Sequence, residues 1–371
     1  MRVIGRMDLN RALLARQLLL NRRDLDVRCA VESLVGLQAQ VPNAPYVSLW
    51  SRLERFEPDD LSALVEEREV VRAPLMRATI HLVTARDCAR LRPVLQSVFE
   101  RSFGSSPFAK NLDGVDLAEV RQAGRALLAE PRTRAALGRA LGERWPDRDP
   151  LSLAYAVTYL LPAVQIPPRG VWGKRSQATW VAAETWLGRR LEAGARVEEA
   201  VLRYLAAFGP ATVQDVALWS GLTGVRDVVE SLRPWLRTYR DEDGRELFDV
   251  EDGLLPDPES PAPPRFLPEF DNVLLSHADR SRIVEGGRNP PIPSGGGAGP
   301  ALGTVLIDGF MCATWLLERG RGGDAARLVV TPFAQFGRRH EEAVCYEGER
   351  LLAFVAADAA DRDVVLAVPA A

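Results

Sequence analysis

Two glutamines separated by one residue, Gln38 and Gln40, are the side chains whose type and spacing best suggest chemistry. Pro42 favours extended backbone at the residue before it, and in extended backbone side chains two positions apart point to the same side. The two carboxamides would then converge, with Ala39 turned away, and could hold a water molecule or a sugar oxygen. In a helix this spacing would separate them. The alternative is that both glutamines are exposed and only solvate a turn.

The other residue types predict neither a metal site nor a cofactor. The four cysteines are widely separated and form no C-x-x-C pair, so we expect free thiols rather than a zinc site or disulfides. The sequence contains no H-E-x-x-H, G-x-S-x-G or Gly-rich phosphate motif. Metalloenzymes, esterases and nucleotide hydrolases are therefore disfavoured.

Positive charge is concentrated locally although the chain as a whole is slightly acidic. The net charge is −3, which alone argues against a nucleic-acid partner. Arginines nevertheless dominate residues 1–30, and Arg169, Lys174 and Arg175 lie close together, whereas residues 241–259 are densely acidic. A local positive groove is what DNA phosphates respond to. We therefore predict that these three side chains contact DNA, with a purely solvated role as the alternative.

The glutamine pair lies inside a predicted unit of three helices followed by a hairpin. Apolar residues at helical spacing cover residues 9–18 and 27–35, and a third helix is expected over 43–53. β-rich runs at 70–73 and 77–83 then flank a turn. This is the order of a winged helix-turn-helix. Arg77 and His81 lie on its second strand and could contact DNA, although His81 could equally be an interior histidine.

The same order recurs twice in diverged form, over residues 116–172 and 197–250, with a connecting helix expected at 177–193. Residues 265–275 and 303–317 are again β-rich, and a Gly- and Pro-rich loop between them, at 289–300, is expected to be mobile. A last helix is expected over 331–354, before a small acidic tail. We predict an α+β fold with boundaries at 1–110, 111–195 and 196–255 for three winged helix units and 256–371 for a β-rich C-terminal domain.

Three segments resemble the winged-helix DNA glycosylase family that contains AlkZ and YcaQ. They are residues 37–50, 77–84 and 265–279, and the similarity extends over nearly the whole chain. The resemblance implies three tandem winged helices in a C-shaped arrangement around a DNA-sized channel. The catalytic motif of that family is a glutamine, an apolar residue and then glutamine or aspartate. Gln38-Ala39-Gln40 matches the AlkZ form, so the resemblance implies that Gln38 and Gln40 are the catalytic pair.

The resemblance further implies hydrolysis of the N-glycosidic bond of N7-alkylated purines, including purines in interstrand crosslinks, for DNA repair or self-resistance to a genotoxin. The enzyme would be monofunctional and monomeric, would need no cofactor or metal, and would act on double-stranded DNA carrying alkylated or crosslinked guanine. The alternative is a non-catalytic winged-helix DNA-binding protein, a transcriptional regulator or damage sensor, which would need no amide pair. No apolar stretch is long enough to span a membrane, and the first residues lack the apolar core of a signal peptide, so we expect a cytoplasmic location.

Overall fold

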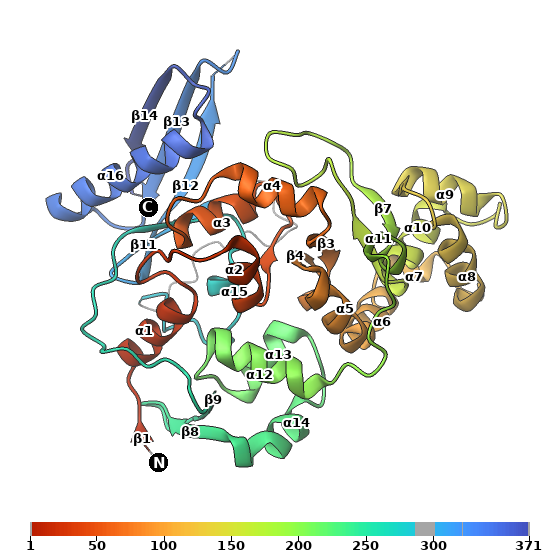
Figure 1. The fold of residues 1–371 in the computed structure, drawn as a ribbon, viewed down its shortest axis with the longest axis horizontal. Coiled ribbons are helices and arrows are strands. Elements are labelled where there is room, and N and C mark those ends of the chain that lie inside the picture. The colour runs from red at the N-terminus through yellow and green to blue at the C-terminus, as the bar shows by residue number, and fades with distance from the viewer. Residues whose placement is uncertain (1, 286–300, 321, 370–371) are drawn as a thin grey trace.

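The chain combines helices with three β-sheets in the described residues (Figure 1). The computed structural model describes residues 2–285, 301–320 and 322–369, so the loop expected at 289–300 lies outside the described residues. Within the described part, no helix is long and apolar enough to cross a membrane.

The first repeat contains a short strand between its helices and one helix more than the sequence indicated. Its elements are α2 (Val27–Ser33), β2 (Leu37–Gln38), α3 (Ala44–Arg52), α4 (Pro58–Glu66), β3 (Val70–Pro74) and β4 (Ile80–Thr84), preceded by α1 (Arg6–Arg16). The helices expected near 9–18, 27–35 and 43–53 are confirmed. The prediction that 43–53 directly precedes the hairpin is wrong, because Pro58 in the first turn and a capping box between Glu57 and Asp60 start α4 there.

The second and third repeats follow the same order of helix, short strand or bridge, two helices and hairpin. The second consists of α8 (Leu117–Leu127), β5 (Arg132–Thr133), α9 (Arg134–Gly142), α10 (Pro150–Leu160), β6 (Ala163–Gln165) and β7 (Thr179–Ala182). The third consists of α12 (Val197–Phe208), a bridge between Ala211 and Phe248, α13 (Val213–Ser220), α14 (Val225–Leu232), β8 (Leu236–Arg240) and β9 (Glu246–Val250). The helix expected over 177–193 is wrong, because this segment starts as β7 and is helical only in α11 (Ala183–Leu187).

The hairpins of the first two repeats form one sheet. Its strand order is β2-β4-β3-β6-β7-β5, and the two hairpins meet where Arg72 on β3 pairs with Gln165 on β6. Three more helices connect these repeats, namely α5 (Ala85–Val94), α6 (Gln96–Gly104) and α7 (Pro107–Lys110). β1 (Arg2–Val3) adds in parallel to β8 of the third repeat. The first two repeats are therefore joined by backbone pairing as well as by side chains.

The C-terminal part is a five-stranded sheet packed against one long helix, at the upper left of Figure 1. Its elements are β10 (Arg265–Leu267), α15 (Asn272–Leu275), β11 (Gly303–Ile307), β12 (Phe310–Arg319), β13 (Ala325–Pro332), α16 (Arg338–Val355) and β14 (Asp361–Leu366). The expected β-rich character is confirmed. The predicted start of the last helix at 331 is wrong, because β13 extends to Pro332 in register with β12, and the predicted tail contains a strand paired with β13.

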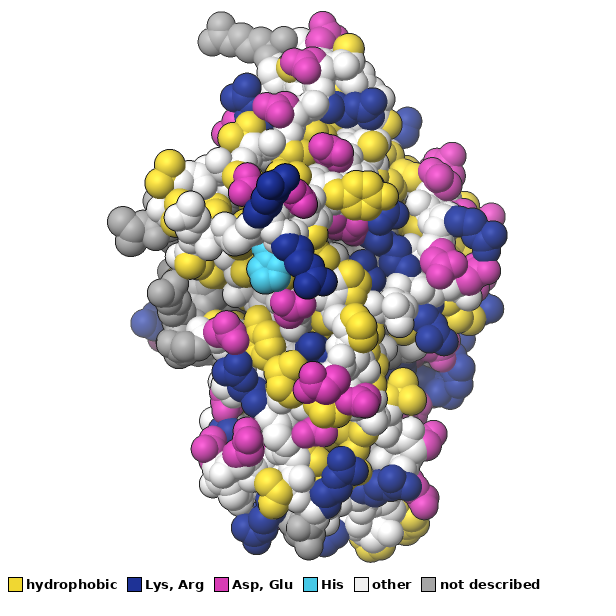
Figure 2. Space-filling view, turned by 90° about the vertical axis from the view of Figure 1, so that its left-hand side faces the viewer, with side chains coloured by type: hydrophobic (Ala, Val, Ile, Leu, Met, Phe, Trp, Pro, Cys, Tyr) yellow, Lys and Arg dark blue, Asp and Glu magenta, His cyan; other side chains and the backbone are white. Residues whose placement is uncertain are grey.

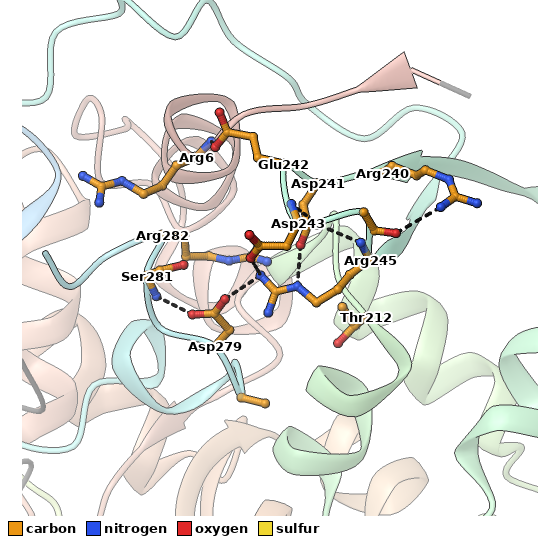
Figure 3. Close-up of polar contacts among 12 residues, drawn as sticks. Arg6, Thr212, Arg240, Asp241, Glu242, Asp243, Arg245, Asp279, Ser281 and Arg282 are labelled. Atoms are coloured by element: carbon orange, nitrogen blue, oxygen red, sulfur yellow. Dashed lines mark hydrogen bonds and ion pairs between the residues drawn. The ribbon is translucent and has the colours of Figure 1, made fainter. Parts of the chain in front are cut away.

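Buried ion pairs and a charged cluster join the repeats to the C-terminal part. Arg52 on α3 donates to both carboxylate oxygens of Asp271, at 3.0 and 2.9 Å, and both side chains are almost fully buried. Arg245, at the end of the β8–β9 turn, donates to Asp241 at 2.7 Å and to Asp279 at 2.6 Å (Figure 3). These contacts hold residues 271–279 against both the first and the third repeats.

Candidate active site

The sequence before the glutamine pair brings β2 against β4. Gly36 has φ +88°, and a Cβ at this position would lie 2.5 Å from Val83 Cγ1 and 3.0 Å from the Leu82 carbonyl oxygen. Glycine is therefore required by both the backbone conformation and the close approach. Gln38 then pairs with His81 in β4, and the Ala39 amide donates to the Ile80 carbonyl at 2.8 Å. The predicted extended backbone is confirmed at Gln38, but the strand ends there, and Gln40 and Val41 lie in a bend.

Both glutamine carboxamides contact the segment 77–81. Gln38 is only 8% exposed, and its Oε1 accepts a hydrogen bond of 2.8 Å from the Arg77 guanidinium. Gln40 is exposed, and its Oε1 accepts a hydrogen bond of 3.3 Å from the Ile80 amide. Ala39 is fully buried in the core, as expected. Because a carboxamide oxygen has two lone pairs, each glutamine can still accept one hydrogen bond from a bound water.

Arg77 links three parts of the chain at the glutamine pair. Besides Gln38, its guanidinium donates to Asn272 Oδ1 on α15 at 2.9 Å and to the Trp219 carbonyl on α13 at 3.2 Å. Its backbone has φ +57°, a strained conformation for a residue with a Cβ. Burial lowers the Arg77 pKa to about 10, so the side chain is still a cation at neutral pH. Three hydrogen bonds thus tie the guanidinium to protein acceptors, an arrangement suited to positioning Gln38, and the predicted contact of Arg77 with DNA stays a prediction.

His81 is an interior residue. It is 0% exposed, its Nδ1 lies 3.0 Å from the Thr79 carbonyl oxygen, and its Nε2 lies 3.4 Å from the Arg77 guanidinium. Since Arg77 can only donate, Nε2 accepts and Nδ1 donates to Thr79. Burial, aided by the Arg77 charge, lowers the His81 pKa to about 3. His81 is therefore neutral at physiological pH, and its full burial agrees with the alternative of an interior histidine, whereas its predicted contact with DNA stays a prediction.

Gln40 also lines a polar cavity of about 340 Å³ between the first and second repeats. Arg72 on β3 contributes to this cavity and donates to the Ala39 carbonyl at 2.8 Å, so it holds the backbone between the two glutamines. Arg169 lies in the lining as well. Gln38 is not among the lining residues. The structure therefore brings Gln40 and Arg169 to one cavity, and Gln38, Arg77 and His81 to one hydrogen-bonded cluster beside it.

Lys174 and Arg175 are exposed in the loop between β6 and β7, as a DNA-contacting role requires. Arg169, in the same loop, is half-buried and donates to the Ser176 carbonyl at 2.6 Å. The face carrying α1 and α16 shows a different pattern, since positive and negative side chains alternate there without a continuous basic patch (Figure 2). That face lacks the electrostatic pattern of a DNA-binding surface.

A second cavity, of about 320 Å³ beside the β8–β9 turn, has an ion-paired cluster in its lining. Figure 3 shows Arg245 between Asp241 and Asp279, and Asp279 also accepts from the Ser281 amide at 2.9 Å. His277 is buried, and its Nε2 lies 3.0 Å from the Phe208 carbonyl oxygen, which agrees with a structural role. Among the described residues no group of three or more His, Cys, Asp or Glu side chains is arranged to hold a metal ion.

Comparison with known proteins identifies the class of protein that this fold and glutamine site represent. The model of the DNA glycosylase AlkZ-like family matches residues 31–354. The chain belongs to the AlkZ-like DNA glycosylase family. Its structure is similar to that of the DNA glycosylase AlkZ from Streptomyces sahachiroi, with a TM-score of 0.73 and 20% sequence identity over 99% of this chain and 100% of that one. At this identity the likeness shows a shared fold. No curated protein matches the sequence significantly.

Three residues at the site were not predicted from the sequence, namely Asn272, Arg72 and Arg134, the last of which lines the cavity beside Gln40. Asn272 accepts from Arg77 and donates to the Gly36 carbonyl at 3.2 Å. It lies in the segment 265–279 that carries the family resemblance, and this was the available signal. Arg72 lies in a β-rich run, and Arg134 follows a helix cap, so nothing in their local pattern marks them.

Proposed function

We propose that this chain is a monofunctional DNA glycosylase that hydrolyses the N-glycosidic bond of N7-alkylated purines, including purines in interstrand crosslinks, with Gln38 and Gln40 as the catalytic pair. The observation that carries the proposal is that both carboxamide oxygens accept a hydrogen bond from residues 77–81 and each keeps a second lone pair for a water. Family membership supplies the reaction class.

Two neutral amides suit a leaving group that is already activated. N7 alkylation makes the purine cationic, so the base leaves as a neutral molecule without protonation by a strong acid. What remains is to place a water and to stabilise the positive charge that develops on the sugar, which is a task for preorganised dipoles. Neither Arg77 nor neutral His81, the ionisable groups of this cluster, is a suitable acid at neutral pH. This environment favours damaged purines over intact ones.

The proposed architecture is three tandem winged helix-turn-helix units in a C-shaped arrangement around duplex DNA. The three-fold recurrence of helix, strand or bridge, two helices and hairpin supports it. In this arrangement Gln38 lies on the short strand of the first unit. Lys174 and Arg175 on the exposed β6–β7 loop would contact phosphates. A monofunctional reaction fits, since a lyase step needs an amine nucleophile. Within the described part of the chain, the hydrogen-bond partners of the two glutamine side chains are Arg77 and the Ile80 amide, and neither is a lysine.

The proposal is tested by incubating the purified protein with duplex DNA that contains N7-methylguanine or a nitrogen-mustard crosslink. We expect release of the modified base and an intact abasic strand that breaks only after alkali. Binding of the same duplexes without any base release would instead support a non-catalytic DNA-binding protein. Strand breakage without alkali would contradict the monofunctional assignment.

A further inference from the structure

The cavity beside Gln40 is unusually rich in unpaired positive charge. Arg72, Arg134 and Arg169 all line it, and no aspartate or glutamate is among its lining residues. Within the described part of the chain their hydrogen bonds go to uncharged groups, namely two backbone carbonyls, the Gln165 carboxamide and the Thr158 hydroxyl, and none of the three forms an ion pair. Arg72 and Arg169 are close enough to repel, and burial together with this repulsion lowers the Arg72 pKa to about 10. An anion in the cavity would relieve this repulsion.

The same lining residues carry buried donors that lack an acceptor. These atoms are Nε and Nη1 of Arg72, Nε of Arg169 and Nε1 of Trp180. Arg72 is only 2% exposed and Trp180 only 1%. Buried donors in native proteins are nearly always hydrogen-bonded, so several unpaired donors around one cavity make it suited to an acceptor-rich group.

Arg134 is fixed in place by aromatic rings. Its guanidinium carbon lies 4.2 Å from the Tyr155 ring centre and 4.7 Å from that of Trp180. Its Nε donates to the Thr158 hydroxyl at 3.3 Å. A guanidinium held this way has little side-chain entropy left to lose on binding, and its planar donors match a phosphate group.

We propose that this cavity binds a phosphate group of the DNA strand that carries the damaged base. The inference rests on the proposed catalytic role of Gln40, which lines the same cavity. A phosphate held here fixes the distance between the strand backbone and the glutamine pair, because Arg72 contacts both the cavity and the Ala39 carbonyl. The cavity does not favour the N7-alkylated base itself, since that base is a cation.

A binding experiment that needs no catalysis tests the proposal. The probe is a duplex with a tetrahydrofuran abasic analogue, in which single phosphates on either side are replaced one at a time by uncharged methylphosphonate. Affinities are measured for the parent protein, Arg169→Gln, Arg169→Lys and Arg139→Gln. Arg139 is an exposed arginine on α9 outside the lining, so Arg139→Gln is the matched loss of charge.

We expect one methylphosphonate position to weaken parent binding about 10-fold to 100-fold, the range for a hydrogen bond to a charged group. Arg169→Gln should weaken binding to the unmodified duplex and should lose part of the sensitivity to that one position, because Arg72 and Arg134 still contact the phosphate. Arg169→Lys and Arg139→Gln should keep the full sensitivity. If the losses of affinity caused by Arg169→Gln and by each methylphosphonate are additive at every position, the proposal is overturned. Inorganic phosphate at matched ionic strength could raise the melting temperature of the parent protein although no methylphosphonate position depends on Arg169. This result would assign the cavity to a free anion and overturn its assignment to DNA.

This readout is independent of the glutamine mechanism. If the coupling is found but Gln38 and Gln40 prove dispensable for base release, the phosphate site stands and the proposed catalytic pair fails. If the glutamines are essential and no phosphate is coupled to Arg169, only the phosphate site fails.

Discussion

Replacing Arg77 with methionine should uncouple Gln38 from its support while leaving the backbone conformation unchanged, since both residues carry a Cβ at φ +57°. The change removes the donor to Gln38 at 2.8 Å, to Asn272 at 2.9 Å and to the Trp219 carbonyl at 3.2 Å. A buried acceptor left unpaired costs about 1–3 kcal/mol. The variant no longer has to desolvate a cation, and this gain offsets part of the loss. We therefore expect the free energy of unfolding to fall by about 2–4 kcal/mol.

The catalytic effect should exceed the loss of stability. Without Arg77 the Gln38 carboxamide is free to rotate, and a displacement of about 1 Å at a catalytic group typically lowers the rate about 10²-fold. The assay is single-turnover release of N7-methylguanine at saturating protein, at a temperature where urea titration shows the variant to be folded. Arg101→Met is the matched control, because Arg101 donates to the Gly221 carbonyl on the neighbouring loop without touching Gln38. If the Arg77→Met variant is folded and releases the base at the parent rate, the positioning role of Arg77 is refuted.

Three further outcomes follow from charge and burial. Affinity for undamaged duplex DNA should fall about 10³-fold or more between 50 and 200 mM salt if six or more phosphates are contacted. The slope of log affinity against log salt concentration should be smaller in Lys174→Gln and Arg175→Gln. A salt-independent affinity would contradict this prediction. The free energy of unfolding, measured by urea titration, should fall as the pH decreases from 6.5 towards 3, by up to about 1.4 kcal/mol per pH unit for each of His81 and His277. The reason is that burial lowers both pKa values to about 3, so only the unfolded chain takes up these protons in this range. His277→Gln should remove one of the two contributions, whereas His340→Gln, at a side chain 46% exposed, should leave both in place. Base release should be unchanged in EDTA, and loss of activity that zinc or magnesium restores would overturn the metal-independent mechanism.

The sequence allowed the repeated elements to be predicted because each carries a local signal. Asp26 caps α2 by accepting from the Cys29 amide at 3.1 Å, and Thr212 caps α13 within a capping box. Signals of this kind depend on residues a few positions apart. The joining of the first two hairpins through Arg72 and Gln165 depends on residues 93 positions apart, and no local pattern indicates it.

The site could be predicted at the level of the glutamines but not of their surroundings. Pro42 predicted extended backbone at the residue before it, but Gln40 and Val41 lie in a bend, and the strand at Gln38 comes from pairing with β4. The roles of Arg77 and His81 did not follow, because an arginine and a histidine on a β-hairpin are equally compatible with DNA contact and with burial. The hydrogen bonds of Arg77 to Asn272 and the Trp219 carbonyl depend on tertiary packing, which no local pattern indicates.

The most direct test of the account is the rate of N7-alkylguanine release by Gln38→Ala, Gln40→Ala and the double variant under single-turnover conditions. Each single replacement should lower the rate by about 10²-fold or more, the scale for deleting one preorganised polar group, while DNA affinity changes by less than about threefold. The double variant should be only slightly slower than the slower single variant, because residues that act as a unit are not additive. If both single variants release the base at the parent rate, the amide-pair mechanism is wrong and the segment 37–40 is purely structural.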